Sequence, residues 1–391
     1  MAKLTSELST RAGRYFSQPS GYRAFVPAPL PPAPPIAVEG ELLKLLSDAD
    51  RALARLDAVS TFLPNPDLFV AMYVRQEAVL SSQIEGTQST LEDVLAYEAN
   101  PSHNNAPKDV EEVVNYVRAM NHGLRRLPEL PLSLRLLREI HQELMHNVGG
   151  GERTPGEFRT SQNWIGVPGS TLKDAAFVPP PPHELMRCLG DFEIFIHAHK
   201  ADTPLLILCG LAHAQFETIH PFLDGNGRVG RLLIALMLCE ANALSQPLLY
   251  LSHYLKAHRS EYYDRLTAIR ERGDWEGWLR FFLRGVAEVS LQANETARHI
   301  IALREAQRAK FVANANALKL IDALFARPVV NVKQCSEILD VSYVTANSLV
   351  AKLEKDGLLK EVTNGGRNRV FRFRAYLALF SGEGAPDGAT K

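Results

Sequence analysis

The chain has 391 residues, of which 46% are hydrophobic and 22% are charged, and its formal net charge is −1. This balance is typical of a soluble globular protein, and the length indicates two or three domains. The near-zero net charge gives no indication of a nucleic-acid or membrane partner for the chain as a whole. The charge is uneven, however, because residues 310–380 hold eleven Lys/Arg against six Asp/Glu.

The N-terminus and the cysteines indicate the compartment. Residues 1–16 contain no apolar segment of the kind found in signal peptides. The most apolar stretches, 204–214 and 232–244, are shorter than the roughly 18 residues that span a bilayer. The cysteines form no CxxC pair, so we expect them to be buried and reduced. We therefore predict a cytoplasmic protein without a membrane segment. The four cysteines are Cys188, Cys209, Cys239 and Cys335.

The first part of the chain is predicted to become helical after an irregular start. Residues 1–25 are polar, and the proline-rich stretch 26–38 favours an extended arm packed along the domain surface. Apolar residues then recur at helical spacing from Leu42, until Pro64 and Pro66 end the run. Further helices are predicted at residues 68–85, 89–98, 108–125 and 132–147.

A glycine-rich stretch separates these helices from a second helical series. Residues 149–170 are predicted to form a loop with a short hairpin, or flap, near 163–167. The body of the protein is therefore expected to be mainly α, a helical bundle with a β-hairpin flap. The helices predicted after the loop are 183–199, 204–217, 227–243, 258–271 and 274–309.

The C-terminal part has a different pattern. Three short helices are predicted from Leu320 to Lys355, and two apolar runs flank Asn364-Gly365, a strong hairpin signal. Three helices and a hairpin resemble a winged helix-turn-helix. The expected domains are an N-terminal helical region at 1–105, a catalytic core at 106–300, a winged helix at 301–378 and a disordered tail at 379–391.

The densest chemical pattern is the segment 220–231, HPFLDGNGRVGR. Gly225 and Gly227 allow a tight turn and a close approach of the backbone to a ligand. A helix is predicted to begin there, and the free N–H groups at its start favour an anion. Arg228 and Arg231 are three residues apart, so they share a helix face and can bind phosphate oxygens.

The same segment holds the remaining parts of a phosphate-transfer site. Asp224 is a hard oxygen ligand suited to Mg²⁺, and Asn226 can donate to a phosphate oxygen. His220 has an ordinary pKa near neutral pH and can act as a general base. Together these groups favour in-line attack on a metal-bound phosphate. The alternative is a glycine-rich turn that caps a helix, with surface arginines.

The segment resembles the signature of the Fic family, HxFx[D/E]GNGRxxR, with every constrained position filled. The preceding residues 212–222 and the segments 163–167 and 177–182 also resemble the family, over most of residues 20–300. The resemblance implies transfer of AMP from Mg-ATP to a Ser, Thr or Tyr hydroxyl of a target protein, and self-modification is a further possibility.

The resemblance also implies roles for individual residues. His220 would take the hydroxyl proton, Asp224 would hold Mg²⁺, and Arg231 would bind the γ-phosphate. Arg228 would bind the β-phosphate or support the local fold. The phosphates would lie against Gly225, Asn226, Gly227, Val229 and Gly230. The flap residues Asn163, Trp164, Ile165, Gly166 and Val167 would bind the target as an added strand. Tyr254 and Tyr263 are candidates for contacts on the adenine side, although paired tyrosines on a helix are more often part of a core.

An inhibitory motif precedes the catalytic segment. Residues 81–86, SSQIEG, resemble the family motif [S/T]xxxE[G/N]. Ser81 and Glu85 are four residues apart and would share a helix face, with Gly86 next. The resemblance implies that Glu85 pairs with Arg231 and takes the place of the γ-phosphate. Without the resemblance, the segment is an ordinary helix C-terminus.

Three alternatives remain open at this stage. The same site could remove AMP by hydrolysis, with Glu85 orienting water, and related proteins can use other nucleotides or phosphocholine. A zinc site at His197 and His199 lacks further ligands at the usual spacing. The winged helix could contact DNA or a protein, and a homodimer is possible. The basic residues considered for DNA are Lys352, Lys355, Arg367, Arg369, Arg372 and Arg374.

Overall fold

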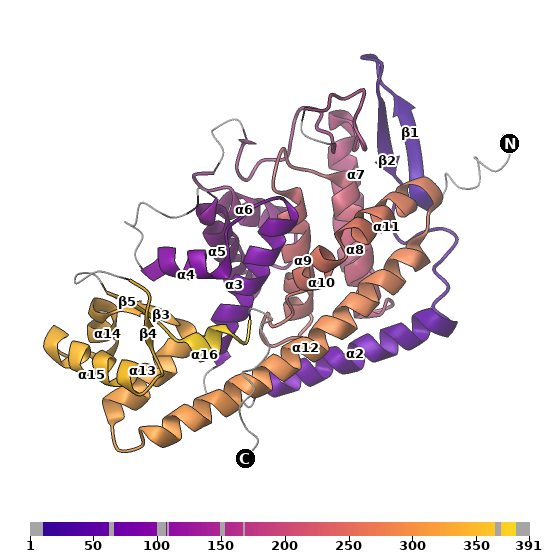
Figure 1. Ribbon diagram of the computed structural model, residues 1–391. Helices are drawn as coiled ribbons and strands as arrows, with labels where there is room; N and C mark the ends of the chain where they lie inside the picture. Colours follow the sequence, from indigo (N-terminus) through magenta and orange to yellow (C-terminus); the bar gives the residue numbers. More distant parts are fainter. Residues whose placement is uncertain are drawn as a thin grey trace.

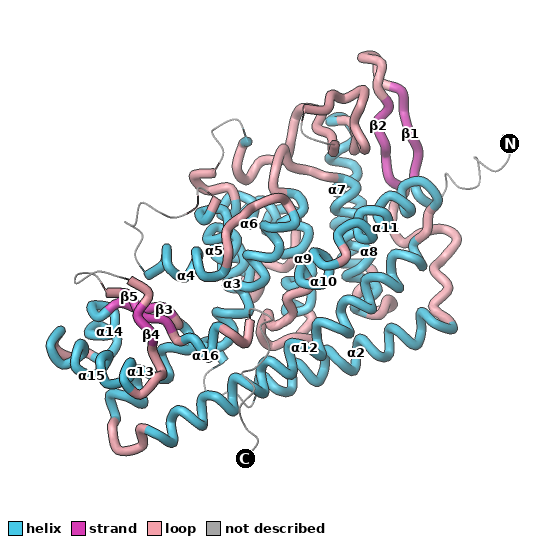
Figure 2. The backbone as a smooth tube through the Cα atoms, in the orientation of Figure 1, coloured by secondary structure: helices cyan, strands magenta, loops and turns pink. Residues whose placement is uncertain are grey.

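The structure is a computed structural model that describes residues 11–61, 66–99, 107, 109–148, 153–166, 169–363 and 369–380. Helices form most of it, and the strands lie at two opposite ends, in the N-terminal hairpin and in the C-terminal unit (Figure 2). The mainly α class predicted from the sequence is confirmed. Among the described residues, no helix has the length and apolarity needed to cross a bilayer.

Two central helices carry the loop that joins them. The helix α8 (Leu205–Ile219) is buried at every position from Leu206 to Ile219, and α9 (Asn226–Glu240) is buried almost as completely. Because both helices are apolar on all sides, they form the middle of the bundle rather than its surface. The residues between them, 220–225, are therefore held on a rigid support (Figure 1).

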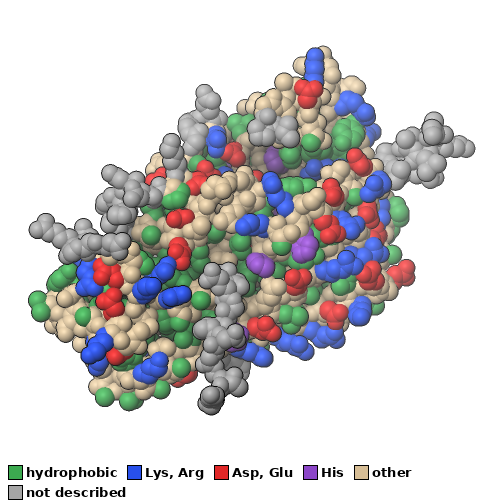
Figure 3. Space-filling model, in the orientation of Figure 1, with side chains coloured by type: hydrophobic (Ala, Val, Ile, Leu, Met, Phe, Trp, Pro, Cys, Tyr) green, Lys and Arg blue, Asp and Glu red, His purple; other side chains and the backbone are tan. Residues whose placement is uncertain are grey.

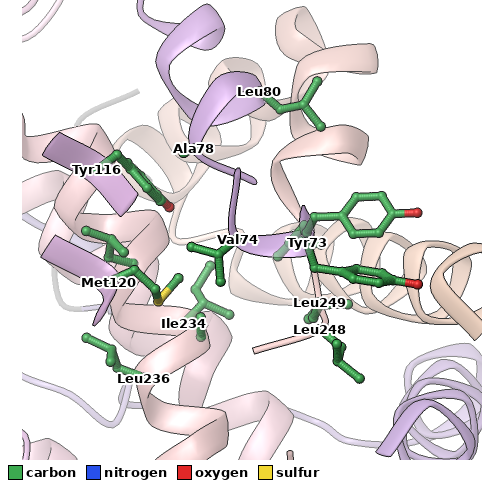
Figure 4. Close-up of a cluster of buried hydrophobic side chains, with 14 of the residues drawn as sticks. Tyr73, Val74, Ala78, Leu80, Tyr116, Met120, Ile234, Leu236, Leu248 and Leu249 are labelled. Atoms are coloured by element: carbon green, nitrogen blue, oxygen red, sulfur yellow. The ribbon is translucent and has the colours of Figure 1, made fainter. Parts of the chain in front are cut away.

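Five helices pack on this central pair or on its neighbours, and their predicted existence is confirmed with ends shifted by a few residues. The region between α3 (Pro66–Ile84), α5 (Val110–Arg126) and α9 is filled by Val74, Tyr116, Met120 and Ile234 (Figure 4). These side chains join the N-terminal helices to α9, so the N-terminal region and the catalytic core share one hydrophobic core. The five helices are α3 (Pro66–Ile84), α4 (Leu91–Ala99), α5 (Val110–Arg126), α6 (Leu134–Leu144) and α7 (Pro182–Ala198).

A pair of long helices forms one side of the molecule. The helix α2 (Gly40–Thr61) packs for most of its own length along the longer helix α12 (Trp275–Lys310) (Figure 1). Acidic and basic side chains are intermixed over this face (Figure 3). The helix α12 continues through residue 300, where a domain boundary was expected, and the next helix begins at Ala315. Between α9 and α12 lie two helices, α10 (Ser252–Ala257) and α11 (Arg259–Arg272).

The C-terminal unit contains the three predicted helices and a small sheet. Its strand order is β3-β5-β4, with both neighbouring pairs antiparallel. The predicted turn at Asn364-Gly365 lies outside the described residues. The short strand β3 and the short helix α16 were not predicted. The elements are α13 (Ala315–Ala326), β3 (Val329–Asn331), α14 (Val332–Leu339), α15 (Tyr343–Lys355), β4 (Lys360–Glu361), β5 (Val370–Arg372) and α16 (Arg374–Leu377).

This unit packs directly on α3. Phe380 lies edge-on to Tyr73 of α3, with ring centroids 5.5 Å apart, and its carbonyl accepts a hydrogen bond from the side chain of Gln76. The helix α13 also lies against α3. The first two residues of the tail expected at 379–391 are therefore part of the packed structure, and residues 381–391 lie outside the described residues.

The N-terminal segment forms a hairpin rather than the irregular start that was expected. Strands β1 (Gly13–Ser17) and β2 (Arg23–Pro27) pair antiparallel, with Tyr15 opposite Phe25. Phe25 is buried against Phe177, and its N–H donates to the carbonyl of Val178 at 2.9 Å. The prediction failed because this strand pair is stabilised by a segment 150 residues later in the chain, which local patterns do not reveal.

Candidate active site

The loop from His220 to Gly225 joins the two central helices in the way the glycine pattern indicated. His220 ends α8 in the left-handed region, with φ +51°, and its N–H donates to the carbonyl of Phe216. Gly225 precedes α9 with φ +73°, a conformation that favours glycine. The helix α9 begins at Asn226, one residue earlier than predicted.

The side chain of Asn226 braces this loop. Its Oδ1 accepts a hydrogen bond from the Phe222 N–H, and its Nδ2 donates to the Phe222 carbonyl, both at 2.8 Å. The amide is buried and both of its polar atoms are used within the loop. One N–H of Nδ2 is thus used within the loop, and the donation from Asn226 to a phosphate oxygen stays a prediction.

His141 braces the loop from α6, and sequence reasoning missed it. Its ring stacks on Phe222, with centroids 3.8 Å apart. Burial lowers the pKa of His141 to about 4, so the ring is neutral at physiological pH. Because Nδ1 accepts from the Gly156 N–H, the proton is assigned to Nε2, which donates to the Asp224 carbonyl at 3.1 Å. In this tautomer the hydrogen bond from His141 to the Asp224 carbonyl holds the turn that leads into α9.

The start of α9 is an anion-binding position, and Glu85 lies on it. The first N–H bonded within the helix is that of Val229, to the Gly225 carbonyl, so the preceding N–H groups have no partner inside the helix. A Cβ atom on Gly227 would overlap with Oε1 of Glu85. The carboxylate of Glu85 therefore rests against the backbone where an anionic ligand would bind.

Arg231 holds this carboxylate in place. Its Nη2 donates to Oε1 of Glu85 at 2.6 Å and to the Ser81 carbonyl at 3.0 Å, and its Nε donates to Oγ of Ser81 at 2.7 Å. Burial opposes ionisation of both partners. Even so, the pKa of Glu85 is lowered and that of Arg231 is raised, because the two charges attract each other. The pair expected from the resemblance is present.

The helix carrying the inhibitory motif ends slightly earlier than predicted. The helix α3 ends at Ile84, so Glu85 lies in the turn that follows it, and Gly86 has φ +108°. Ser81 remains inside the helix and is fully buried. Leaving the helix at Ile84 turns the Glu85 side chain toward α9.

Asp224 and Arg228 form a charged edge beside the loop. Asp224 is partly exposed and pairs with Arg153, and its Oδ1 accepts from the Gly225 N–H. Arg228 is almost fully buried and donates to Glu112 of α5 at 2.9 Å. Arg153 and Glu112 were not identified from the sequence. Among the described residues no cluster of three or more His, Cys, Asp or Glu could hold a metal, so Asp224 would need ligand oxygens from a bound phosphate to complete a Mg²⁺ site.

The imidazole of His220 is neutral and partly accessible. Burial lowers its pKa to about 4, and the nearby positive charges of Arg270 and Arg159 act in the same direction, whereas Glu85 opposes them. Its Nδ1 is buried and accepts or donates no hydrogen bond among the described residues. A neutral ring with an uncommitted nitrogen can accept a proton.

This geometry agrees with comparisons with known proteins. Residues 43–125 match the Fic/DOC family N-terminal model, and residues 131–238 match the Fic/DOC family model. The chain contains a Fic domain. The solved Fic family protein from Desulfovibrio desulfuricans G20 has the same fold, with a TM-score of 0.56 at 18% identity over 87% of this chain and 97% of that one. The Fic domain containing signaling protein from Bacteroides thetaiotaomicron VPI-5482 gives a TM-score of 0.51 at 18% identity, over 64% and 95% of the two chains.

Curated relatives of the Fic domain are named protein adenylyltransferase Fic. The protein from Aedes aegypti is 34% identical over 152 residues, which is 38% of this chain and 27% of that protein. The protein from Drosophila grimshawi is 28% identical over 197 residues, which is 50% of this chain and 36% of that protein. The chain thus covers about a quarter to a third of the length of these relatives.

The flap of the Fic domain is less regular than predicted. Ile165 forms one antiparallel bridge with Phe177, in place of a hairpin ladder. Trp164 is 41% exposed, and its indole N–H donates to the Ser170 carbonyl. Gly166 lies beside Ser170, and Val167 is outside the described residues. The side chain of Asn163 faces inward and donates to the carbonyls of His220 and Phe222. Docking of a target on the flap stays a prediction.

The two tyrosines proposed for adenine contacts lie in different places. Tyr263 of α11 is 39% exposed and lies beside Tyr262, with ring centroids 5.0 Å apart, and its adenine-side role stays a prediction. Tyr254 of α10 is buried, stacks near His258 and lines a groove between α2 and α12. This burial and the contact with His258 are typical of a packed side chain, and the adenine-side role of Tyr254 stays a prediction.

Two buried carboxyl groups near Arg231 were not predicted from the sequence. Only their helical spacing from motif residues connects them with the site. Glu77 of α3 accepts hydrogen bonds from Tyr116 and from Ser252. Glu217 of α8 lies against Gly230, and its Oε1 has no hydrogen-bond partner among the described residues. Burial raises the pKa of each carboxyl group to about 7.

Replacing Glu217 by glutamine is expected to stabilise the protein at pH 8 but not at pH 4.5. The carboxyl group ionises near pH 4.5 when unfolded and near pH 7 when folded, so its contribution to the free energy of unfolding falls as pH rises through this window. The variant avoids this loss, which is at most about 3 kcal/mol. Denaturant unfolding of both proteins at the two pH values measures it, and comparing them cancels the opposite contribution of the buried histidines. Equal differences at both pH values would contradict it.

Proposed function

We propose that this chain transfers AMP from Mg-ATP to a Ser, Thr or Tyr hydroxyl of a target protein, and that Glu85 inhibits the transfer. The observation that carries the proposal is the Glu85–Arg231 pair on the start of α9, where the helix N–H groups favour an anion. A site that already holds one carboxylate in this position is suited to a phosphate group. The names of the curated relatives point to the same reaction.

The residues divide the chemistry among them. The hydroxyl oxygen of the target forms a bond to the α-phosphorus, and the bond from this phosphorus to the oxygen that bridges the α- and β-phosphates breaks. Pyrophosphate leaves, and His220, neutral in the structure, takes the hydroxyl proton. Arg231 and the start of α9 bind the β- and γ-phosphates, and Arg228 supports them from the same helix face.

Asp224 would hold Mg²⁺ in this site. Its carboxylate is a hard oxygen donor, is partly exposed, and stands at the residue before the turn into α9. When bound, the ion would neutralise charge on the phosphates. The ion pair with Arg153 would have to open, because that guanidinium occupies the same carboxylate.

The inhibition follows from competition for one guanidinium. Arg231 is buried, and Glu85 already occupies the position beside it at Gly227 where a phosphate would bind. A γ-phosphate can reach it only when Glu85 moves away. ATP bound with Glu85 in place would leave its triphosphate in an unproductive position.

Radiolabelled ATP tests the proposed reaction. With the protein as its own acceptor, label at the α-phosphorus is expected to stay on the protein after denaturing gel electrophoresis, and label at the γ-phosphorus is not. Retention of the γ-label alone would indicate phosphorylation and would contradict AMP transfer. A protein already carrying AMP, incubated without ATP, tests the reverse hydrolysis, which uses the same residues.

The structure offers less support for DNA binding by the C-terminal unit than its composition did. Arg369 pairs with Glu354 and Glu361, and Arg372 pairs with Glu92 of α4. Of the other arginines considered for DNA, Arg374 of α16 is exposed, and Arg367 lies outside the described residues. We therefore expect no retention of duplex DNA in a gel shift at physiological salt. Retention that weakens as salt is raised would contradict this expectation.

A further inference from the structure

Three buried side chains grip the carbonyl groups at the end of α8, where His220 sits. Arg159 donates from Nε to the His220 carbonyl at 2.9 Å and from Nη2 to the Pro180 carbonyl at 2.6 Å. Arg270 of α11 donates to the Glu217 carbonyl at 3.2 Å and to Oγ1 of Thr218 at 3.3 Å. Asn163 donates to the His220 carbonyl at 3.2 Å. We call Arg159, Asn163 and Arg270 the carbonyl clamp.

The two arginines of the clamp are unusual as buried charges. Neither forms an ion pair with a carboxylate within 4.0 Å among the described residues, and each is at least nine-tenths buried. Arg270 instead stacks on the ring of Phe177, 3.9 Å from its centroid. Burying a guanidinium without a close carboxylate is costly, and such costs are most often tolerated at functional sites.

The position of the clamp gives the arginines a role. The C-terminal end of a helix carries partial negative charge, which favours a protonated histidine there. His220 is the residue that ends α8, so the carbonyls of 217–220 would by themselves promote its protonation. Two guanidinium groups bound at this helix end offset the partial negative charge of the carbonyls and place positive charge near the imidazole.

We propose that Arg159 and Arg270 are positioning residues, which hold the end of α8 and keep the imidazole of His220 neutral so that it can accept a proton. This inference rests on the proposed function, in which His220 is the base. The charged groups that act on His220 agree with it, because Arg270 and Arg159 favour the neutral ring and Glu85 opposes them. The backbone oxygen of Glu217 also favours the protonated ring.

The first test reads the imidazole directly and needs no catalytic activity. The Cε1–H resonance of His220 is assigned by its loss in His220→Ala and followed by NMR as pH is lowered. In the wild type we expect the ring to remain neutral to below pH 5, in keeping with a pKa of about 4. In Arg270→Gln the midpoint is expected to rise by about one pH unit, because one nearby positive charge is lost.

Two variants separate this role from a general effect on folding. Arg265→Gln removes the same charge from the same helix, but at a side chain that pairs with Glu261 outside the clamp. Arg270→Lys keeps the charge but loses the two donations that the guanidinium makes to Thr218 and to the Glu217 carbonyl. We expect both to leave the titration of His220 unchanged. A midpoint in Arg270→Gln equal to that of the wild type, or the same shift in Arg265→Gln, would overturn the proposal.

A second readout connects the clamp to the reaction. In a Glu85→Gly background, the acidic limb of the pH–rate profile for self-modification is expected to move to higher pH in Arg270→Gln and to stay in place in Arg265→Gln. Absence of AMP transfer in all of these proteins would count against the proposed function alone, since the NMR titration still decides whether the clamp controls His220. An unmoved limb with normal turnover would overturn the inference.

Discussion

Replacing His220 by alanine is expected to abolish measurable AMP transfer while leaving ATP binding in place. The variant removes the group that takes the hydroxyl proton, which typically contributes about 10²–10⁴-fold to the rate. The proposed phosphate contacts come from the start of α9 and from Arg231, which the substitution does not touch. Rates of α-label incorporation and the affinity for Mg-ATP by calorimetry, both in a Glu85→Gly background, measure the two effects separately.

The control for this variant is another histidine. His197 is exposed near the end of α7, outside the loop 220–225, so His197→Ala is expected to keep the full rate. A His220→Ala protein that still transfers AMP at the parental rate would remove His220 from the reaction. A loss of ATP affinity equal to the loss of rate would indicate that the variant disturbs the pocket rather than the proton transfer.

Replacing Glu85 by glycine is expected to raise the rate of self-modification. The change frees Arg231 from the carboxylate and opens the start of α9 to the terminal phosphate. Removal of such a competing contact corresponds to an increase of roughly 5–150-fold, the usual range of coupling between two binding events. Because Glu85 follows the end of α3, the glycine does not interrupt a helix.

A graded series makes this prediction sharper. Glu85→Gln keeps the size of the side chain but removes its charge, so its rate is expected to lie between those of the wild type and Glu85→Gly. Arg231 keeps its two hydrogen bonds to Ser81 in both variants but loses its carboxylate partner, so both are expected to unfold at a lower temperature than the wild type. Equal rates in all three proteins would show that the carboxylate does not inhibit the reaction.

The parts of the site that lie close together in the sequence were predictable. The twelve residues 220–231 form one turn between two helices, so their spacing determines which of them are neighbours. Ser81 and Glu85 are likewise brought together by four residues of helix and turn. The pairing of Glu85 with Arg231, 146 residues away, came from the resemblance, because no local pattern encodes such a contact.

The residues that were missed act across long separations. Arg159 reaches the end of α8 from 61 residues earlier in the chain, and Arg270 from 53 residues later. Their residue type does not indicate burial, because arginine is usually exposed. The amides of Asn163 and Asn226 were expected to face ligands, but unpaired loop carbonyls compete for them. The N-terminal hairpin was missed for the same reason, because a distant segment completes its hydrogen bonds.

The fold shows how the inhibition could depend on the rest of the chain. The helix α3 carries Ser81 at one end and packs against the C-terminal unit through Tyr73 and Gln76. Its middle is fixed to α10 by the hydrogen bonds of Glu77 with Ser252. The position of Glu85 is thus set by a helix with partners on several sides.

Intact-mass spectrometry of the Glu85→Gly protein after incubation with Mg-ATP tests the central claim most directly. We expect adducts of one AMP residue on the protein, fewer in the wild type and none when His220 is also replaced by alanine. Two results would contradict the proposed reaction. One is a Glu85→Gly protein that binds Mg-ATP but stays unmodified although an accessible hydroxyl acceptor is present. The other is an AMP adduct that still forms without His220.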